Sequence, residues 1–382
     1  MNGPSNKVVI DLGALRHNYT LIRRSLIDPD TKIIAIVKSD AYGHGMVEVA
    51  KALESQPALW GFGVAEVWEA DRLREHGIHG KILLISGVAT EKECERAISK
   101  GYVIGITSRD EALLVSRVAQ RLGKGAHCHL KVDSGMTRFG LTEEEVLSLV
   151  QARREVLSGV NLEGLYSHLA CADEPDSPFN REQIQDFHRI LDGVKALGWM
   201  PHLVHLLNSS GIFNFPQEQL DAVRPGIALY GAMDGGRETV PLRQVMRVVT
   251  KVRTIRCIPR GAFVGYGSTF RLERDSRLAI IPMGYDDGLM RSLSNRGSVL
   301  VKGRRVPIIG RISMRSTVID VTECPGVDVG DEVVIIGTQG DETMSAVELA
   351  ASAGTISYEL LCLLGTRNPR IFVDAEVDDI ST

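Results

Sequence analysis

The sequence contains no long run of charge of one sign and no long apolar segment. Its 48 acidic and 44 basic residues are interspersed and give a net charge of −4. Because nucleic acids and anionic lipids attract basic clusters, this pattern argues against both partners and favours a small molecule. No run of about 18 apolar residues occurs, and the first residues contain no apolar segment. We therefore expect a soluble, cytoplasmic protein with no membrane partner.

Closely spaced cysteine pairs are also missing. The six cysteines are scattered without a C-x-x-C pair, as expected of reduced thiols. His127-Cys128-His129 has residue types that bind metals, but alternation along a strand sends Cys128 to the opposite face from the two histidines. We expect no metal site.

The length of 382 residues exceeds the roughly 250 to 300 at which a single core stops growing, so two domains are expected. Before residue 240, short apolar runs alternate with segments of helical periodicity, among them 67–76, 109–122, 143–156 and 181–197. The apolar runs are 33–38, 61–65, 82–86, 102–107, 128–133, 162–169, 203–209 and 222–230. Eight such units predict an α/β fold, a (β/α)8 barrel of the TIM type. A doubly wound sheet shares the alternation, but the G-x-G-x-x-G sequence that would follow its first strand is not found.

From Leu242 onward the pattern changes to short strands separated by turns. The expected strands are 248–258, 278–283, 298–301, 308–312, 318–321 and 332–336. A mainly β C-terminal domain therefore follows the barrel. We predict a barrel domain over residues 1–240 and a β domain over residues 241–382. The first few residues of the chain could pair with the β domain instead of the barrel.

Lys38 ends the first apolar run and is followed by small and turn-forming residues, Ser39-Asp40-Ala41-Tyr42-Gly43-His44-Gly45. An amine held against apolar neighbours loses hydration, so its pKa falls and the neutral form can attack a carbonyl to make a Schiff base. Taken alone, a lysine in this position is more often a solvated strand end.

Other polar residues also end predicted barrel strands, where the active sites of such barrels are built. Arg138 follows the fifth run, His168 ends the sixth, Asn208-Ser209-Ser210 the seventh and Arg224-Pro225-Gly226-Ile227 the eighth. Singly, each has a structural explanation, since a histidine at a strand end is more often hydrogen-bonded within the fold. The second domain adds four segments: Gly265-Tyr266-Gly267-Ser268-Thr269-Phe270, Ile281 to Gly288, Gly310-Arg311-Ile312-Ser313-Met314 and Ser357-Tyr358-Glu359.

Together these segments, with Val37 to Gly45, resemble the motifs of the alanine racemase family in the same order, from about residue 8 to residue 372. The resemblance implies pyridoxal 5'-phosphate held as a Schiff base on Lys38, with catalytic Lys38 and Tyr266 acting on an amino acid. It implies that the cofactor phosphate is held by Tyr42, Ser209, Gly226, Ile227 and Tyr358, and that Arg224, bonded to His168, faces the pyridine nitrogen. It places Arg138 and Met314 on the substrate and Tyr285, Arg311 and Arg315 at the entrance.

The chemistry of racemisation agrees with these roles. A proton must leave one face of Cα and return on the other, which requires two bases on opposite sides, and the resemblance assigns the D face to Lys38 and the L face to Tyr266. A phenol is a poor base at neutral pH, and Arg224 acting through His168 would favour its ionised form. An arginine does not surrender its proton, so the pyridine nitrogen beside it stays unprotonated and transamination is disfavoured.

One position departs from the family pattern. Arg315 stands where aspartate is usual, beside a pocket for a carboxylate and a phosphate, so we expect changes in affinity or substrate range. Lys131 lies seven residues before Arg138, where some family members carry a carbamylated lysine, and the sequence leaves open whether this modification occurs.

The expected function is interconversion of L- and D-alanine, supplying D-alanine for peptidoglycan. The resemblance also implies a head-to-tail homodimer in which Tyr266 comes from the partner chain. The alternatives are an amino-acid racemase of broader specificity, which includes serine, a decarboxylase on the same two-domain plan, and a non-enzymatic pyridoxal-phosphate carrier protein. The carrier lacks a second domain and its tyrosine.

Overall fold

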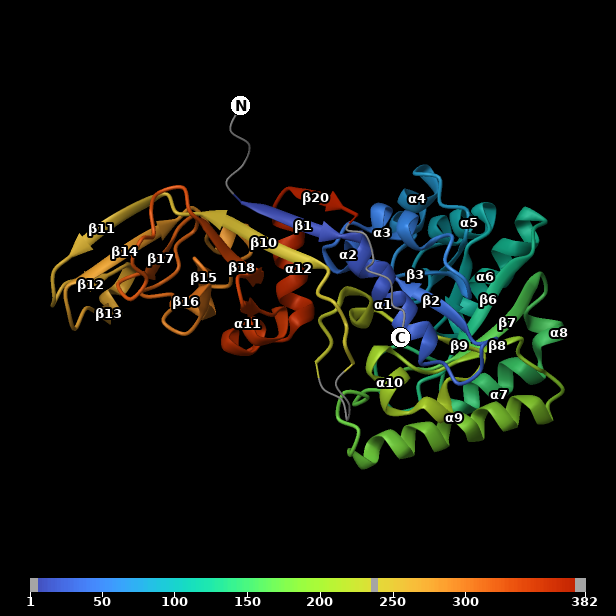
Figure 1. Cartoon of the computed structure of the whole chain (residues 1–382). Coiled ribbons are helices and arrows are strands. Elements are labelled where there is room, and N and C mark those ends of the chain that lie inside the picture. The colour runs from blue at the N-terminus through green and yellow to red at the C-terminus, as the bar shows by residue number, and fades with distance from the viewer. Residues whose placement is uncertain (1–5, 235–239, 375–382) are drawn as a thin grey trace.

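The computed structural model describes residues 6–234 and 240–374 and shows a parallel barrel joined to a mainly β domain (Figure 1). The ends of both predicted domains, residues 1–5 and 375–382, and the segment 235–239 lie outside the described residues. Among the described residues no single helix is long and apolar enough to cross a membrane. The bent pair α11 (Ala346–Ala353) and α12 (Ser357–Arg367) has sufficient length and apolar character only when the two helices are taken together.

Eight parallel strands close the barrel in sequence order, which confirms the predicted fold class. They are β2 (Lys32–Ile36), β3 (Leu59–Val64), β4 (Lys81–Leu84), β5 (Val103–Ile106), β6 (Ala126–Lys131), β7 (Val160–Tyr166), β8 (Leu203–His205) and β9 (Ala222–Val223). Both faces of these strands are covered, so they are apolar without alternation. In β2, Ile34 and Ile36 belong to a cluster inside the barrel, and Ile33 and Ala35 pack in the main core.

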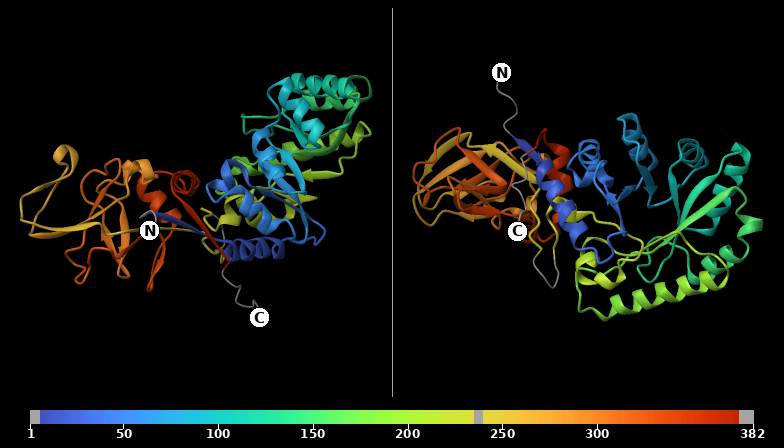
Figure 2. Two further views of the ribbon diagram at one scale, coloured as in Figure 1. Left: turned by 90° about the horizontal axis from the view of Figure 1, so that it is seen from above. Right: turned by 45° about the vertical axis from the view of Figure 1, so that its right-hand side comes forward.

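Helices surround the barrel and follow its strands (Figure 2). They are α1 (Leu12–Arg24), α2 (Lys38–Tyr42), α3 (Met46–Leu53), α4 (Val67–Glu75), α5 (Glu91–Lys100), α6 (Arg109–Leu122), α7 (Glu143–Gln151), α8 (Arg153–Val156), α9 (Pro178–Ala196) and α10 (Ser209–Asn214). Short 3-10 turns are η1 (Pro216–Glu218) and η2 (Ile227–Tyr230). Side-chain caps fix several starts, since Thr90, Ser108 and Thr142 accept from the third backbone N–H of α5, α6 and α7.

The second domain is built on one large and two small sheets. Its strands are β1 (Lys7–Asp11), β10 (Met246–Lys251), β11 (Thr254–Ile258), β12 (Phe263–Val264), β13 (Phe270–Arg271), β14 (Ser276–Ile281), β15 (Ser298–Val301), β16 (Arg304–Pro307), β17 (Thr317–Asp320), β18 (Glu332–Gln339), β19 (Glu342–Met344) and β20 (Arg370–Val373). The remaining elements are η3 (Tyr266–Ser268), η4 (Tyr285–Asp287), η5 (Arg291–Leu293), α11 (Ala346–Ala353) and α12 (Ser357–Arg367). Strand β1 lies between β10, antiparallel to it, and β20, parallel to it, so the N-terminal strand belongs to the β domain's sheet.

Two predicted strands of this domain are wrong. The run 248–258 is divided into β10 and β11 because the chain changes sheets: Val252 donates to Asp331 O, whereas Arg253 donates to Ile280 O on β14. The run 308–312 is a loop after a single bridge between Ile308 and Ile319. Ile309 N still donates to Val318 O on β17, but beyond it Gly310 N donates to Asn295 Oδ1 and Ile312 N donates to Ser294 Oγ, so the strand does not continue.

Candidate functional site

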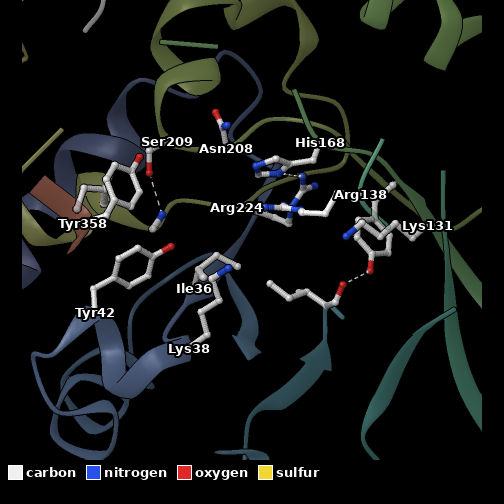
Figure 3. A pocket seen from close by; sticks show the side chains of 14 residues that line it. Ile36, Lys38, Tyr42, Lys131, Arg138, His168, Asn208, Ser209, Arg224 and Tyr358 are labelled. Carbon is white, nitrogen blue, oxygen red and sulfur yellow. Dashed lines mark hydrogen bonds between the residues drawn. The ribbon is translucent and has the colours of Figure 1, made fainter. Parts of the chain in front are cut away.

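A pocket of about 250 Å³ lies at the C-terminal ends of the barrel strands (Figure 3). Nine of the residues predicted for the site line it: Lys38, Tyr42, Arg138, His168, Ser209, Arg224, Gly226, Ile227 and Tyr358. Tyr358 comes from α12, so the β domain's last helix completes the pocket's wall. In Figure 3, Tyr42 and Tyr358 lie at one end of the pocket and Arg138 and Lys131 at the other, with Lys38 and Arg224 between them.

Lys38 opens an unusual turn. The strand β2 ends at Ile36, two residues before the predicted end, and Ser39, Asp40, Ala41 and Tyr42 all have φ between 52° and 55°. Left-handed backbone costs each non-glycine residue about 1–2 kcal/mol, so four in succession need external support. Asp40 supplies part of it by accepting from Met46 N at 2.9 Å and pairing with Arg370 at 2.5 Å.

Two further side chains hold this turn. The buried Glu69 carboxylate accepts from Ser39 N at 2.6 Å and from Ala65 N and Glu66 N at the end of β3. The ring of His44 makes 3.0 Å hydrogen bonds through Nδ1 to the carbonyl oxygens of Ala41 and Tyr42. The turn that carries Lys38 is therefore fixed from two sides, and Lys38 is held in a defined position at the pocket floor.

Burial sets the state of the Lys38 amine. Desolvation lowers its pKa, the charge of Arg138 lowers it further, and the carboxylate of Glu69 acts in the opposite direction. A lowered pKa increases the fraction of neutral amine, which is the form that attacks a carbonyl.

The pocket is strongly cationic. Lys38, Lys131, Arg138 and Arg224 line it, and none of the lining residues in the described parts of the chain is acidic. Burial, Arg224 and Arg138 lower the pKa of Lys131 to about 8, and its amine lies over the rings of Phe139 and Tyr166. Such a charge distribution favours an anionic ligand.

Arg224 is buried and most of its donors are engaged. Nη1 donates to His205 Nδ1 at 2.7 Å and to His205 O at 2.9 Å, and Nη2 donates to Ser167 O at 2.5 Å and Leu206 O at 2.8 Å. His168 Nδ1 is a more distant neighbour of Nη2, at 3.4 Å. Burial lowers the pKa of Arg224 to about 10, which still leaves it charged at neutral pH. Of its five N–H groups, only Nε–H has no partner within the described residues.

Hydroxyl groups gather at the other end of the pocket. Ser209 Oγ accepts from Gly226 N at 2.8 Å and Ala228 N at 3.1 Å, which leaves its own hydrogen to donate. The rings of Tyr42 and Tyr358 are tilted by 50° with centroids 5.8 Å apart, and neither hydroxyl has a hydrogen-bond partner among the described residues. A Cβ at Gly226 would lie 2.5 Å from Tyr42 Oη, so only glycine leaves this space open.

The other predicted residues lie outside this pocket. Tyr266 is 71% exposed, and the strands β12 and β13 that flank it lie at the end of the β domain away from the barrel (Figure 1). Met314 and Tyr285 are also exposed, and Arg311 and Arg315 are exposed on the same loop as Met314. Arg315 pairs with Asp286 at 3.1 Å and Asp287 at 3.3 Å, which ties this loop to the Tyr285 segment.

Tyr166 and His205 belong to the site and were missed by the sequence analysis. Tyr166 lines the pocket, lies under the Arg224 guanidinium at 5.5 Å from its ring centroid, and stacks on His205 at 4.8 Å. Both residues lie within predicted strands: Tyr166 is two residues before His168, and His205 is three residues before Asn208. In the segment His127-Cys128-His129, Cys128 and His129 are buried, whereas His127 is exposed and pairs with Glu163. The described residues contain no cluster suited to a metal.

Comparison with known proteins identifies both domains. Residues 10–234 match the family described as alanine racemase, N-terminal domain, and residues 245–372 match alanine racemase, C-terminal domain. The chain is 37% identical over 377 residues to alanine racemase 2 of Caldanaerobacter subterraneus subsp. tengcongensis, covering 98% of this chain and 96% of that protein.

Solved structures show the same likeness. The alanine racemase from D-cycloserine producing Streptomyces lavendulae superposes with a TM-score of 0.91 at 32% identity, covering 98% of each chain. The alanine racemase from Bartonella henselae, solved with covalently bound pyridoxal phosphate, has a TM-score of 0.88 at 32% identity and covers 97% of this chain and 100% of its own.

Proposed function

This chain belongs to the alanine racemase family, and on that premise we propose that it interconverts L- and D-alanine with pyridoxal phosphate held covalently on Lys38. The observation that carries the proposal is the single pocket in which a buried lysine, a charged arginine with a free Nε–H and a set of hydroxyl donors meet.

The residues of the pocket fit the cofactor. The hydroxyls of Tyr42, Ser209 and Tyr358 and the space kept open at Gly226 suit a phosphate, with Ile227 beside them. Arg224 would offer its remaining N–H donor to the pyridine nitrogen and, because it keeps its proton, would leave that nitrogen unprotonated. When bound, pyridoxal phosphate withdraws electron density from the substrate Cα and so makes its proton acidic.

Arg138 acts at the opposite end of the pocket, and Lys38 acts between the two ends. Arg138 binds the substrate carboxylate through a charge-assisted pair, which fixes the amino acid beside Lys38. The Lys38 amine holds the cofactor and, once released from it, takes or returns the Cα proton on the D face. Its lowered pKa supports this role because a base must be unprotonated to accept a proton.

The second base comes from another chain. Tyr266 is exposed and is absent from the lining of its own chain's pocket. We infer a head-to-tail homodimer in which Tyr266 of each protomer reaches the pocket of its partner and serves the L face. Met314 would there meet the substrate carboxylate through its backbone, and Tyr285, Arg311 and Arg315 would line the entrance.

Alanine is the proposed substrate because two tyrosine rings, Tyr266 and Tyr358, leave a small space for the side chain. A broader amino-acid racemase that also accepts serine is the second candidate, favoured by Arg315 at the entrance. In the cell, we propose a cytoplasmic enzyme whose D-alanine supplies peptidoglycan.

The test combines turnover with labelling. Purified protein given L-alanine should lose optical rotation until both enantiomers are equal, and serine should react more slowly. Borohydride reduction followed by peptide mapping should place the pyridoxyl group on the Lys38 peptide, with Lys131 as the matched lysine in the same pocket. A label on Lys131 would refute the assignment of Lys38, and the absence of racemisation would refute the function.

A further inference from the structure

A line of buried hydrogen bonds runs from Arg224 into the barrel interior, away from the pocket. Arg224 Nη1 contacts His205 Nδ1 at 2.7 Å, and His205 Nε2 contacts His129 Nδ1 at 3.0 Å. Both histidines are fully buried, and neither lines the pocket. His129 Nε2 has no hydrogen-bond partner among the described residues, and the ring of Trp60 lies 5.5 Å from the His129 ring, centroid to centroid.

The position of each proton follows from the chemistry of the arginine. A guanidinium has donors only, so His205 Nδ1 must accept and the His205 proton must sit on Nε2. That Nε2–H donates to His129 Nδ1, which places the second proton on His129 Nε2. The contact with Trp60 suits this N–H because an aromatic face is a weak acceptor.

Charges around the pair keep both rings neutral. Burial and Arg224 hold the pKa of His205 well below its usual range, and burial, Lys81 and Arg224 lower that of His129 to about 3. Arg224 and Lys81 are cations, and Tyr166, which stacks on His205, donates its hydroxyl to Ile85 O at 2.9 Å.

The barrel makes room for the pair. A Cβ at Gly164 on β7 would lie 2.7 Å from His129 Cγ, so only glycine fits opposite this ring. The pairing of β6 with β7 shifts register between Cys128 and His129, so that β7 has one extra residue there, Glu163, and Gly164 lies opposite His129.

We propose that His205 and His129 are positioning residues for Arg224, forming a neutral hydrogen-bond chain with both protons on Nε2 that fixes the guanidinium so that its Nε–H faces the pocket. The part of this inference that concerns the cofactor rests on the proposed function. Both histidines carry their proton on Nε2, on the side away from Arg224. The hydrogen-bond chain therefore offers the arginine an acceptor and cannot deliver a proton to it. A change at His129 therefore reaches Arg224 only through His205.

The first test reads the tautomers directly in the cofactor-free protein. Nitrogen-15 NMR of histidine-labelled protein, assigned with His205→Asn and His129→Asn, should show two neutral rings protonated on Nε2 throughout pH 5 to 8, a window of about three units around the ordinary histidine pKa. His44 is the internal control, because its Nδ1 faces two carbonyl oxygens and must carry the proton. Protonation of His205 on Nδ1, or its titration in this window, would overturn the proposal.

The second test separates positioning from packing. His205→Leu fills the space without an acceptor, whereas the amide oxygen of His205→Asn can take the place of Nδ1. We expect the leucine variant to lose about tenfold in kcat with KM within about twofold and to shift the absorption maximum of the bound cofactor, and the asparagine variant to recover most of both. Equal kcat and equal spectra in two variants with the same Tm would refute the positioning role.

The two tests also separate this inference from the function it builds on. If the wild-type protein does not racemise alanine, the proposed function fails, and the tautomers in the cofactor-free protein still decide the histidine chain. If a leucine variant does not fold, His129→Asn and His129→Leu offer the same comparison one ring further from the pocket.

Discussion

Lys38 and Lys131 line the same pocket, but their charged neighbours differ. Lys38 has the buried carboxylate of Glu69 to offset its charge, whereas Lys131 is surrounded by Arg224, Arg138 and Lys38, with Asp133 as its weaker opposing charge. Lys131 thus carries a charge in the folded protein that Asp133 offsets only in part.

This difference predicts a stabilising substitution. The pKa of Lys131 is about 8 in the folded protein against 10.5 when exposed, so its charge destabilises the fold by up to about 3 kcal/mol at pH 7. The penalty is complete below pH 8 and disappears as pH rises from about 8 to 10.5, because only the unfolded chain then binds the proton.

Lys131→Met should therefore raise the free energy of unfolding of the cofactor-free protein at pH 7, and the advantage should shrink toward pH 10. Urea denaturation in carbon-dioxide-free buffer measures this change, with Lys92→Met at an exposed position of α5 as the control. If the advantage did not depend on pH, the effect would come from packing and not from charge.

Most of the pocket's residues could be predicted because they occur at strand ends in recognisable motifs. Tyr166 and His205 could not, because their importance depends on contacts made only when the barrel closes. His205 lies 19 residues before Arg224 in the sequence, and a 2.7 Å hydrogen bond joins them in the fold. The same holds for Glu69. In the sequence it is one of several charged residues in a predicted helix, whereas in the structure it is only 2% exposed and hydrogen-bonds to the turn that follows Lys38.

At the scale of elements, α2 depends on segments from the far end of the chain. A Cβ at Gly365 of α12 would lie 2.1 Å from Gly43 O, so the two backbones are in close contact. Arg370, at the start of β20, donates to Asp40 and to Gly43 O at 3.1 Å. The C-terminal elements therefore stabilise the strained turn that carries Lys38.

We predict that Asp40 and Arg370, which form an ion pair, have coupled effects on the free energy of unfolding. Their side chains are only 15% and 20% exposed, so Asp40→Ala and Arg370→Ala should each cost about 1–3 kcal/mol, and the double variant should cost less than their sum. Burial alone would raise the pKa of Asp40, but the hydrogen bonds from Met46 N and Arg370 and the charge of Arg370 together lower it, so this contribution is present at neutral pH and lost as pH falls below about 4. Additive effects in denaturant titrations would show that the pair is not coupled.

The predicted strand boundaries in the β domain are wrong where the chain changes from one sheet to another. The apolar run 248–258 is continuous in the sequence, and nothing in its residues shows that Val252 and Arg253 bond to different sheets. In the barrel, the eighth predicted strand ends early because Pro225 has no N–H, and a 3-10 turn follows at Ile227. The first difference comes from long-range pairing, which periodicity does not contain, and the second comes from a proline that periodicity alone does not take into account.

The loop that carries Met314 is also fixed by an element it does not adjoin in sequence. Arg315 holds Asp286 and Asp287, and Asp287 in turn accepts from Gly284 N at 3.0 Å. Arg315→Asp would place a third carboxylate beside these two and remove a cation from the proposed entrance.

We expect Arg315→Asp to raise KM for alanine about two- to fivefold and to change kcat less, because anion attraction acts on binding more than on proton transfer. Steady-state kinetics with alanine and serine measure both parameters, and Arg315→Ala separates loss of the cation from gain of the carboxylate. Unchanged KM in both variants would show that the position lies outside the path of the substrate.

At the scale of the whole molecule, the two domains are joined at several places. The strand β1 belongs to the sheet of the β domain and leads directly into α1 beside the barrel, and α12 contributes Tyr358 to the pocket. These connections, together with the contacts of α12 and β20 with α2, restrain the β domain. Because β12 and β13 lie at its distant end (Figure 1), Tyr266 does not reach the pocket of its own chain without large rearrangement.

Subunit complementation tests whether Tyr266 serves the partner's pocket. Lys38→Ala and Tyr266→Ala chains are each inactive alone if both bases are required. When the two are mixed and allowed to exchange, roughly half the dimers are mixed, and each has one site that combines an intact Lys38 with an intact Tyr266 from the other chain. Activity should then recover to about a quarter of the wild-type value. If Tyr266 acted within its own chain, every site would lack one base and the mixture would stay inactive, even when mass spectrometry shows that the chains have exchanged.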